Sequence, residues 1–316
     1  MSIASVSRVL QRSSAVSDKT RAKVLEAAAR LNYVPLGAAR SLAVGQHEAQ
    51  GLVLPALKGP YYSELLVGFE ARAAELGQSV VLALADVRRD PGETVRALAT
   101  RIEGLAVHGS VELPEAVLAG LSSAKPLLVI GCGAGSGIDA VGAENTSSAR
   151  DLTAHLMEHG RRQLLFLGAP HPCDVRDRYE GFVLAHVERG LEAPEPVPIS
   201  FEEADGVRFA QQFLAGDHEA DGVVCANDEV ALAVLDHLMR SGVRVPDDLA
   251  ITGWDDVMAA RYVRPGLTTV RQPVREIGEL AATRLHERVT GVGPATGPVV
   301  LPTELVLRGS CGCPDL

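Results

Sequence analysis

The chain has 316 residues, of which 47% are hydrophobic and 22% charged. This composition is typical of a folded globular protein and excludes a disordered chain or a small disulfide-stapled one. No stretch reaches the roughly 18 to 20 uncharged apolar residues that span a bilayer, and the N-terminus lacks the pattern of a secretory signal, so we expect a cytoplasmic protein without membrane contact. The five cysteines are an odd number spread along the chain, which argues against a disulfide framework.

The charge is distributed unevenly along the chain. The net charge of −10 argues at first against nucleic-acid binding, because Lys and Arg side chains supply most of the affinity for phosphate. Residues 1–46, however, carry seven basic and two acidic side chains, a net +5, and the remainder carries −15. A basic head on an acidic body is typical of an interaction segment, although chance clustering of charges on solvated helices would give the same pattern.

Two short helices are predicted in this head, over residues 2–10 and from Ser17, a plausible N-cap, to Leu31. Each has apolar residues at helical spacing, namely Val6, Val9 and Leu10 in the first helix and Val24, Ala28 and Leu31 in the second. Two helices of this size bury little apolar surface, so the head needs a third helix or a partner.

Beyond residue 50, short apolar runs alternate with amphipathic segments, a pattern that predicts parallel strands joined by crossover helices. The predicted strands are 51–54, 79–85, 104–107, 127–130, 140–142, 163–167, 222–225, 249–252, 268–271 and 299–306. The predicted helices are 63–76, 91–100, 147–159, 177–188, 206–215, 229–241 and 274–289. The repeats fall into two groups, about 50–145 and 146–271, and therefore predict an α/β fold with two doubly wound sheets.

Short motifs then follow one another in a distinctive order. In the head they are SIASVSRVL at 2–10, VSDKTR at 16–21, LNYVP at 31–35 and AARSLA at 38–43. In the body they are RYEGF at 178–182, AND at 226–228, GWDD at 253–256, LTTVRQ at 267–272 and LPTEL at 301–305. With these motifs the whole chain resembles the lac repressor (LacI/GalR) family of bacterial transcriptional regulators.

The resemblance implies a small all-α helix-turn-helix head (1–33), a hinge (34–46) and an effector-binding core (47–316) with the periplasmic-binding-protein-like fold. The N-subdomain would comprise about 47–145 and 274–301, and the C-subdomain about 146–271 and 302–310. The implied function is transcriptional repression by a homodimer bound to a pseudo-palindromic, double-stranded DNA operator. A small effector between the subdomains, a sugar or related polyol, would control it allosterically.

One departure from the family concerns the N-terminus. The family's helix-turn-helix has a further helix, about fourteen residues with its turn, ahead of the position that Met1 occupies. Because Met1 stands where the family commonly has Val, we interpret the start as assigned too late. The alternative is a cytoplasmic sugar-binding sensor of the same fold that does not bind DNA because its head is truncated.

The resemblance also implies which residues contact DNA. The recognition helix and the hinge would supply Ile3, Ala4, Ser7, Arg8, Leu42 and Ala43. Arg8 can donate two hydrogen bonds to guanine, whereas Ile3 and Ala4 offer only apolar contact. Leu42 would wedge into the minor groove and bend the duplex. An ordinary surface helix and an ordinary linker are the alternatives.

The effector contacts implied by the resemblance are polar residues and rings. The polar set is Asn145, Arg178, Asn227, Asp255 and Gln272, and the ring set is Tyr61, Tyr62 and Phe201. A guanidinium, amides and a carboxylate suit the hydroxyls of a polyol, and rings can cover the apolar face of a sugar. Each of these side chains could instead be structural.

Three motifs suggest other chemistry but lack support. HLMEH at 155–159 has the spacing of a zinc peptidase, but such a site also needs a third ligand and a catalytic carboxylate, and the spacing alone is weak evidence. GCGAGSG at 131–137 breaks the dinucleotide-binding pattern at Ser136. CGC at 311–313 is interpreted as a flexible tail rather than a metal site. We therefore expect no catalytic residue, no metal ligand, no cofactor and no enzyme. An exported solute-binding protein of the same architecture would need an export signal, which is missing.

Overall fold

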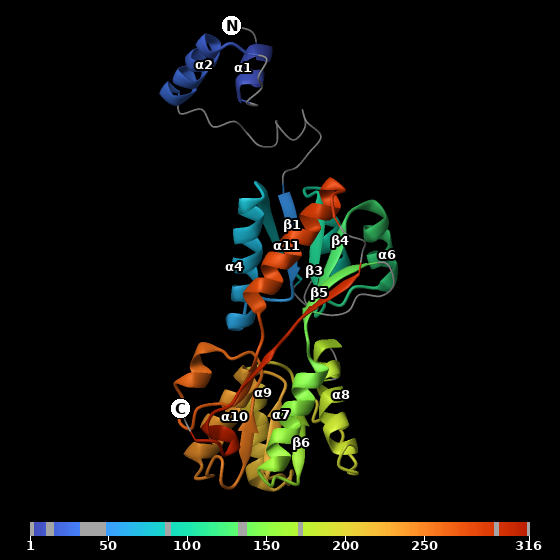
Figure 1. The fold of residues 1–316 in the computed structure, drawn as a ribbon, viewed down its shortest axis with the longest axis vertical. Helices are drawn as coiled ribbons and strands as arrows, with labels where there is room; N and C mark the ends of the chain where they lie inside the picture. Colours follow the sequence, from blue (N-terminus) through green and yellow to red (C-terminus); the bar gives the residue numbers. More distant parts are fainter. Residues whose placement is uncertain are drawn as a thin grey trace. The chain divides into compact units, whose positions relative to one another are not determined.

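The computed structural model describes residues 3–10, 16–31, 49–85, 90–131, 138–169, 173–293 and 297–314. The chain divides into two compact units, Met1–Glu48 and Ala49–Leu316, which are considered separately (Figure 1). Among the described residues, no helix is both long enough and apolar enough to cross a membrane. The hinge residues Leu42 and Ala43 and most of the 131–137 motif lie outside the described residues.

The described part of the first unit contains two helices, α1 (Ile3–Leu10) and α2 (Asp18–Arg30). Among the side chains described in these helices, Val9 from α1 and Val24 from α2 are buried. Ser17 is the N-cap residue of α2, but its backbone carbonyl rather than its side chain accepts the first helical hydrogen bonds. The predicted end of this helix at Leu31 is one residue late: α2 ends at Arg30, and Leu31, the last of the three apolar residues at helical spacing, is 72% exposed.

The second unit has two lobes. The part that we call the N-lobe is built on a parallel sheet of six strands. In spatial order the strands are β2 (Ser79–Leu84), β1 (Ala49–Leu54), β3 (Gly104–His108), β4 (Leu127–Ile130), β5 (Asp139–Ala143) and β10 (Pro298–Leu301). One face is covered by α4 (Gly59–Glu75) and α11 (Val274–Thr290), the other by α5 (Pro91–Ala99) and α6 (Glu115–Ala124) (Figure 1).

The C-lobe repeats this layering around a smaller sheet. Its parallel sheet has the order β6 (Leu164–Leu167), β7 (Gly222–Cys225) and β8 (Ala250–Thr252), and β9 (Thr269–Arg271) pairs with β11 (Glu304–Val306) in an antiparallel ribbon. One face is covered by α7 (Thr146–Glu158) and α8 (Cys173–Val187), the other by α9 (Glu203–Ala215) and α10 (Asp228–Arg240). Short 3₁₀ helices occur at η1 (Met258–Arg261) and η2 (Gly309–Cys311).

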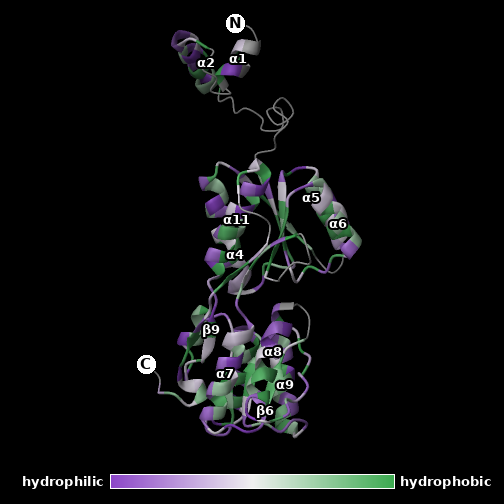
Figure 2. Ribbon diagram, turned by 45° about the vertical axis from the view of Figure 1, so that its right-hand side comes forward, coloured by the Kyte–Doolittle hydropathy of each residue, from purple (hydrophilic) through white to green (hydrophobic). Residues whose placement is uncertain are grey.

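Alternation along the strands explains this layering. In β1, Leu52 and Leu54 pack beneath α4 and α11, whereas Val53 points to the layer of α5 and α6. Figure 2 shows hydrophobic residues concentrated on the strands and on the helix faces toward them. Helices α4 and α11 touch backbone to backbone, because a Cβ at Gly68 or Gly278 would lie 2.1 or 2.3 Å from a carbonyl oxygen of the other helix.

Three described segments connect the lobes: residues 144–145 after β5, residues 272–273 after β9, and residues 302–303 between β10 and β11. The single strand predicted over 299–306 is therefore two strands in different sheets. Pro302 separates them, since it has no N–H for a ladder and stands where the chain passes from one lobe to the other.

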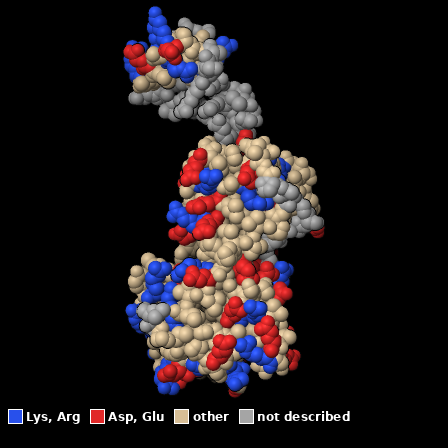
Figure 3. Space-filling model, in the orientation of Figure 1, with Lys and Arg blue, Asp and Glu red and all other residues tan. Residues whose placement is uncertain are grey.

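The predicted fold class is confirmed: two parallel α/β lobes follow a helical head. Most predicted elements are present with ends that differ by a few residues, but α6 was not predicted. The prediction of a flexible tail at 311–313 is wrong, because Cys311 is fully buried in the C-lobe core. Figure 3 shows basic and acidic side chains interspersed on the second unit, so on this face its acidic excess does not form one patch.

Candidate functional site

The predicted effector residues lie at the carboxyl ends of the strands. Tyr61 and Tyr62 follow β1, Arg178 follows β6, and Asn227 and Asp255 follow β7 and β8. Asn145 and Gln272 lie on two of the segments that connect the lobes. Parallel strands place their carboxyl ends at one edge of a sheet, which is where open α/β folds bind ligands.

Arg178 is the centre of a buried hydrogen-bond group. Its Nε donates to Oδ1 of Asn145 at 2.8 Å, Nη1 to the carbonyl of Ala226 at 2.6 Å, and Nη2 to Oδ2 of Asp174 at 3.1 Å. Its guanidinium lies 4.6 Å from the centre of the Trp254 ring, and only 3% of the residue is exposed. With all three nitrogens engaged, the guanidinium plane is fixed.

Two polar atoms beside this group are buried without a hydrogen-bond partner among the described residues. They are Oδ1 of Asp174, an acceptor, and Nε1 of Trp254, a donor. A buried polar atom without a partner is costly, and an acceptor and a donor next to one fixed cation are what a hydroxyl-rich ligand could satisfy. Sequence reasoning missed both residues, although Asp174 lies one helical turn before Arg178 and Trp254 directly precedes Asp255.

Asp255 and Gln272 form a second polar pair, in which Nε2 of Gln272 donates to Oδ1 of Asp255 at 2.5 Å. Asp255 has a φ of 118°, a region that residues with a Cβ rarely adopt. Burial raises its pKa to about 8, against the lowering effect of Arg178. Strain and a shifted pKa together are frequent at functional sites.

A further carboxylate, Asp228, lies behind this pair with no exposed surface. It accepts hydrogen bonds from the Thr269 hydroxyl at 2.6 Å and from the Val257 backbone at 2.9 Å, and its own N–H donates to the carbonyl of Trp254. Burial raises its pKa to about 6. These bonds hold the strand ends that carry Trp254 and Asp255, so Asp228 positions the site.

The N-lobe contributes rings. Tyr61, Tyr62 and His108 meet edge to face, with ring centres 5.3 to 5.6 Å apart. Nδ1 of His108 accepts the backbone N–H of Ser110, so its proton lies on Nε2, which donates to the Tyr61 hydroxyl at 3.3 Å. Burial lowers the pKa of His108 to about 4 and raises the pKa of Tyr62 to about 12. All three rings are therefore neutral at pH 7.

Asn227 and Phe201 have structural contacts of their own. Oδ1 of Asn227 accepts the N–H of Val230 at 3.1 Å and so caps α10, which leaves only its amide NH2 for a ligand. Phe201 is half-buried and packs against the core that includes Trp254. A sequence motif alone does not show whether such a residue caps a helix, packs in the core or binds a ligand.

Two cavities open near these residues. The larger, about 480 Å³, is lined from both lobes by Tyr61, Asp255 and Gln272 among others. The smaller, about 200 Å³, is lined by Asn145. The larger volume lies within the range of small-molecule sites, about 300 to 1,000 Å³. The structure thus brings Tyr61, Asp255 and Gln272 to one cavity, while Arg178, Asn227, Tyr62 and Phe201 do not line either.

Of the predicted DNA contacts, Ile3, Ala4, Ser7 and Arg8 all lie on α1, and the Arg8 side chain is exposed. An exposed guanidinium on a short helix can reach a base edge or a phosphate. The arrangement therefore allows Arg8 to act in recognition.

Both units of the chain resemble known protein families. A model of the bacterial regulatory proteins of the lacI family matches residues 1–35, and a model of the periplasmic binding protein-like domain matches residues 153–311. The HTH-type transcriptional repressor PurR of Haemophilus influenzae is 30% identical over 322 residues, which cover 98% of this chain and 95% of the relative.

Solved structures agree. The lac repressor dimer bound to operator and the anti-inducer ONPF has a TM-score of 0.88 at 27% identity, covering 98% of this chain and 96% of that one. The complex of the transcriptional regulator CelR with cellobiose has a TM-score of 0.75 at 27% identity, covering 96% and 94%. The chain therefore belongs to the LacI family of bacterial regulatory proteins, which are DNA-binding transcriptional repressors rather than enzymes.

Proposed function

We propose that this repressor responds to a sugar or related polyol held between its two lobes. The observation that carries the proposal is the fixed guanidinium of Arg178 beside the unpartnered atoms of Asp174 and Trp254. The neutral rings of Tyr61 and His108 in the other lobe lie close enough to Asp174 and Arg178 to interact with them electrostatically, which suits a ligand with hydroxyls on its edge and apolar C–H faces. The similarity to CelR, solved with cellobiose, supports a carbohydrate.

We also propose that the polar predicted residues bind the effector and that Tyr61, Tyr62 and Phe201 shape its site. The proposed organisation is a head (1–33), a hinge (34–46) and a core whose N-subdomain is 47–145 with 274–301 and whose C-subdomain is 146–271 with 302–310. A homodimer would place two basic heads on a pseudo-palindromic operator, with Ile3, Ala4, Ser7 and Arg8 in the major groove and Leu42 and Ala43 in the minor groove.

Control of DNA binding requires an energetic difference. An effector changes operator affinity only by the ratio of its affinities for the DNA-binding and non-binding arrangements, and DNA changes effector affinity by the same factor. A ligand that contacts both lobes can have such a preference, because it favours one lobe arrangement over others.

A thermal-shift screen tests the ligand class. The full chain would be heated with ribose, glucose, galactose and cellobiose, and separately with adenosine, guanosine, adenine and guanine. A ligand at 100 times its Kd stabilises the folded state by about 2.7 kcal/mol. We expect one sugar to give a shift that Arg178→Lys abolishes. Arg240→Lys, a change at an exposed side chain of α10, should leave that shift intact. A shift with a nucleobase and with no sugar would contradict the polyol assignment.

A second experiment tests DNA recognition. The full chain would select its operator from a random duplex pool, and binding would then be measured for the wild type, Arg8→Ala and Arg240→Ala. Losing a bidentate base contact costs about 1 to 3 kcal/mol and relaxes one base position. We expect that result for Arg8→Ala only. If the wild-type chain selects no sequence yet binds a sugar, the alternative of a sugar-binding sensor without DNA binding is favoured.

A further inference from the structure

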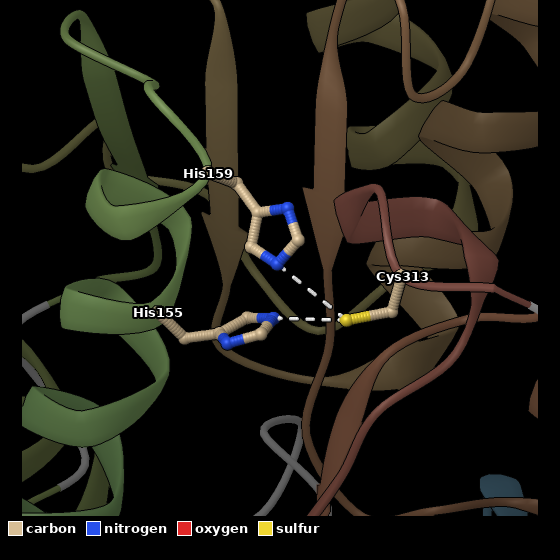
Figure 4. A group of neighbouring side chains, drawn as sticks. All are labelled: His155, His159 and Cys313. Carbon is tan, nitrogen blue, oxygen red and sulfur yellow. Dashed lines mark hydrogen bonds between the residues drawn. The ribbon is translucent and has the colours of Figure 1, made fainter.

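His155, His159 and Cys313 gather in the C-lobe, as Figure 4 shows, and Cys311 lies beside them. His155 lies in the last turn of α7, and His159 is the C-cap residue of that helix. Cys311 ends η2, and Cys313 follows two residues later. Nε2 of His155 lies 3.3 Å from Sγ of Cys311 and 3.5 Å from Sγ of Cys313, and Nε2 of His159 lies 3.5 Å from Sγ of Cys313.

The backbone brings these four side chains together from two segments. His155 and His159 are four residues apart on one helical face, with ring centres separated by 4.5 Å. Between the cysteines, Gly312 has a φ of 109°, and a Cβ there would lie 3.2 Å from Nδ1 of His159. Glycine thus lets the tail turn against α7 with both sulfurs directed at the imidazoles.

The distances fit a shared metal ion. Zinc bonds of about 2.0–2.1 Å to nitrogen and about 2.3 Å to sulfur place tetrahedral ligand atoms about 3.3 to 3.8 Å apart. The nitrogen–sulfur separations of 3.3 and 3.5 Å fall within that range, and the ligand atoms of His155, His159 and Cys313 all lie within 4.8 Å of one another. Sγ of Cys311 lies beside Nε2 of His155 but outside this group of three, so it would complete the shell by a small shift toward His159. A thiol and an imidazole form only a weak hydrogen bond with each other, whereas a thiolate and a neutral imidazole are the ligands that zinc prefers.

The surroundings favour a structural rather than a catalytic ion. Cys311 is fully buried, and the Thr268 hydroxyl lies 3.1 Å from its sulfur, placed to donate to a thiolate ligand. Glu158, the carboxylate that a zinc peptidase would need, is 69% exposed and pairs with Arg189 at 3.6 Å. Four protein ligands would leave no open position for substrate.

We propose that His155, His159, Cys311 and Cys313 bind one Zn²⁺ ion that fastens the C-terminal residues to α7. Each thiol loses a proton on binding, and the two thiolates with two neutral imidazoles complete a tetrahedral shell. Cys311 also packs in the core formed by α7, α8 and the C-lobe sheet, so the ion would stiffen the lobe that carries Arg178 and Asp255.

Cobalt substitution provides the test. The full chain would be reduced, stripped with a chelator and titrated with Co²⁺, then with Zn²⁺. We expect one equivalent of Co²⁺ to produce thiolate charge-transfer absorption and the intense visible bands of tetrahedral cobalt, and one equivalent of Zn²⁺ to remove them. His159→Gln and Cys313→Ser should lose stoichiometric binding. His237→Gln, a matched change on α10 on the opposite face of the sheet, should retain it.

Folding of each variant is checked by circular dichroism. His159 is exposed and Cys313 half-buried, so neither change opens the core. Cys313→His, which supplies another ligand atom, should restore binding with weaker charge-transfer absorption than the wild type. The proposal is overturned if the reduced chain binds no stoichiometric Co²⁺, if its spectrum lacks thiolate bands, or if His159→Gln and Cys313→Ser bind as the wild type does.

Discussion

The two lobes present different chemistry to the region between them. The N-lobe contributes Tyr61, Tyr62 and His108, three rings that are neutral at pH 7 and in contact with one another. The C-lobe contributes the charged Arg178 with Asp174, held by hydrogen bonds to buried partners. Charges that are fixed in advance need no reorganisation when a ligand arrives, so the C-lobe is suited to orient a ligand and the N-lobe to cover it.

This difference implies that substitutions in the two lobes have unequal effects on folding stability and ligand binding. Truncating a charge in the C-lobe leaves its buried partners unsatisfied, and folding suffers together with binding. Removing a neutral group in the N-lobe removes a single hydrogen bond or part of a ring contact. Four substitutions test this contrast.

Arg178→Ala should have the largest effect. It leaves the carboxylate of Asp174 buried without its cation, and breaking a buried pair in this way costs about 3 to 5 kcal/mol. We expect urea unfolding to show a loss of that size and calorimetry to show no sugar binding. Arg176→Ala is the control on the same helix, since its side chain is 62% exposed. Equal stability of the two variants would contradict the role of Arg178.

Asp255→Asn should change the pH dependence of stability. The folded-state pKa of about 8 lies above the ordinary 3.8, so the folded chain holds this proton more tightly than the unfolded chain. The resulting stabilisation is complete below about pH 4 and is lost as the pH rises toward about 8. Asn does not ionise, so the stability of the variant relative to the wild type should increase between about pH 4 and about pH 8.

The gain should reach a few kcal/mol, because each pH unit between the two pKa values corresponds to about 1.4 kcal/mol. Urea unfolding at about pH 4 and about pH 8 measures it. Asp236→Asn, at an exposed carboxylate on α10, is the control and should show no such gain. A stability difference between Asp255→Asn and the wild type that is independent of pH would contradict the raised pKa of Asp255.

Tyr61→Phe should have a smaller effect. It keeps the ring but removes the hydroxyl that accepts from Nε2 of His108, and one hydrogen bond contributes about 0.5 to 1.5 kcal/mol. We expect a weakening of sugar affinity by no more than about tenfold, with folding nearly intact, as measured by calorimetry. A loss as complete as that of Arg178→Ala would mean that the N-lobe orients the ligand as strongly as the C-lobe.

Lys58→Ala should have the smallest effect. Lys58 in the N-lobe pairs with Glu202 in the C-lobe at 2.9 Å, but both side chains are more than half exposed. Water and salt screen such a pair, so its effect on ligand affinity should be slight at low salt and absent at high salt. An effect larger than that of Tyr61→Phe would identify this ion pair as a clamp between the lobes.

Much of the fold could be predicted from local patterns. Buried parallel strands appear as short apolar runs, and β4 and β7 have the predicted bounds. Helix α6 was missed because its sequence, EAVLAGLSSA, mixes small and apolar residues, and Leu121 is its one buried residue. The strand predicted over 299–306 divides at Pro302, because the two halves join different sheets.

The site was predictable only in part. Most effector residues implied by the resemblance lie at strand ends. Asp174, four residues before Arg178, was missed because packing decides that its carboxylate is buried. His108 and Trp254 were missed because their partners, Tyr61 and Arg178, are far away in the sequence. The same reason explains the error about the tail: Cys313 contacts His159 across 154 residues, which no local pattern shows. The local sequence indicates the buried faces and the ends of helices and strands. Tertiary packing decides which of their side chains come into contact.

The central claim is that a ligand between the lobes controls DNA binding. Fluorescence anisotropy on the selected operator, with and without the sugar that gives the largest thermal shift, tests it directly. Allosteric coupling of about 1 to 3 kcal/mol predicts a change in operator Kd of about 5- to 150-fold for the wild type and none for Arg178→Lys. An operator Kd that stays the same at saturating sugar would contradict the account.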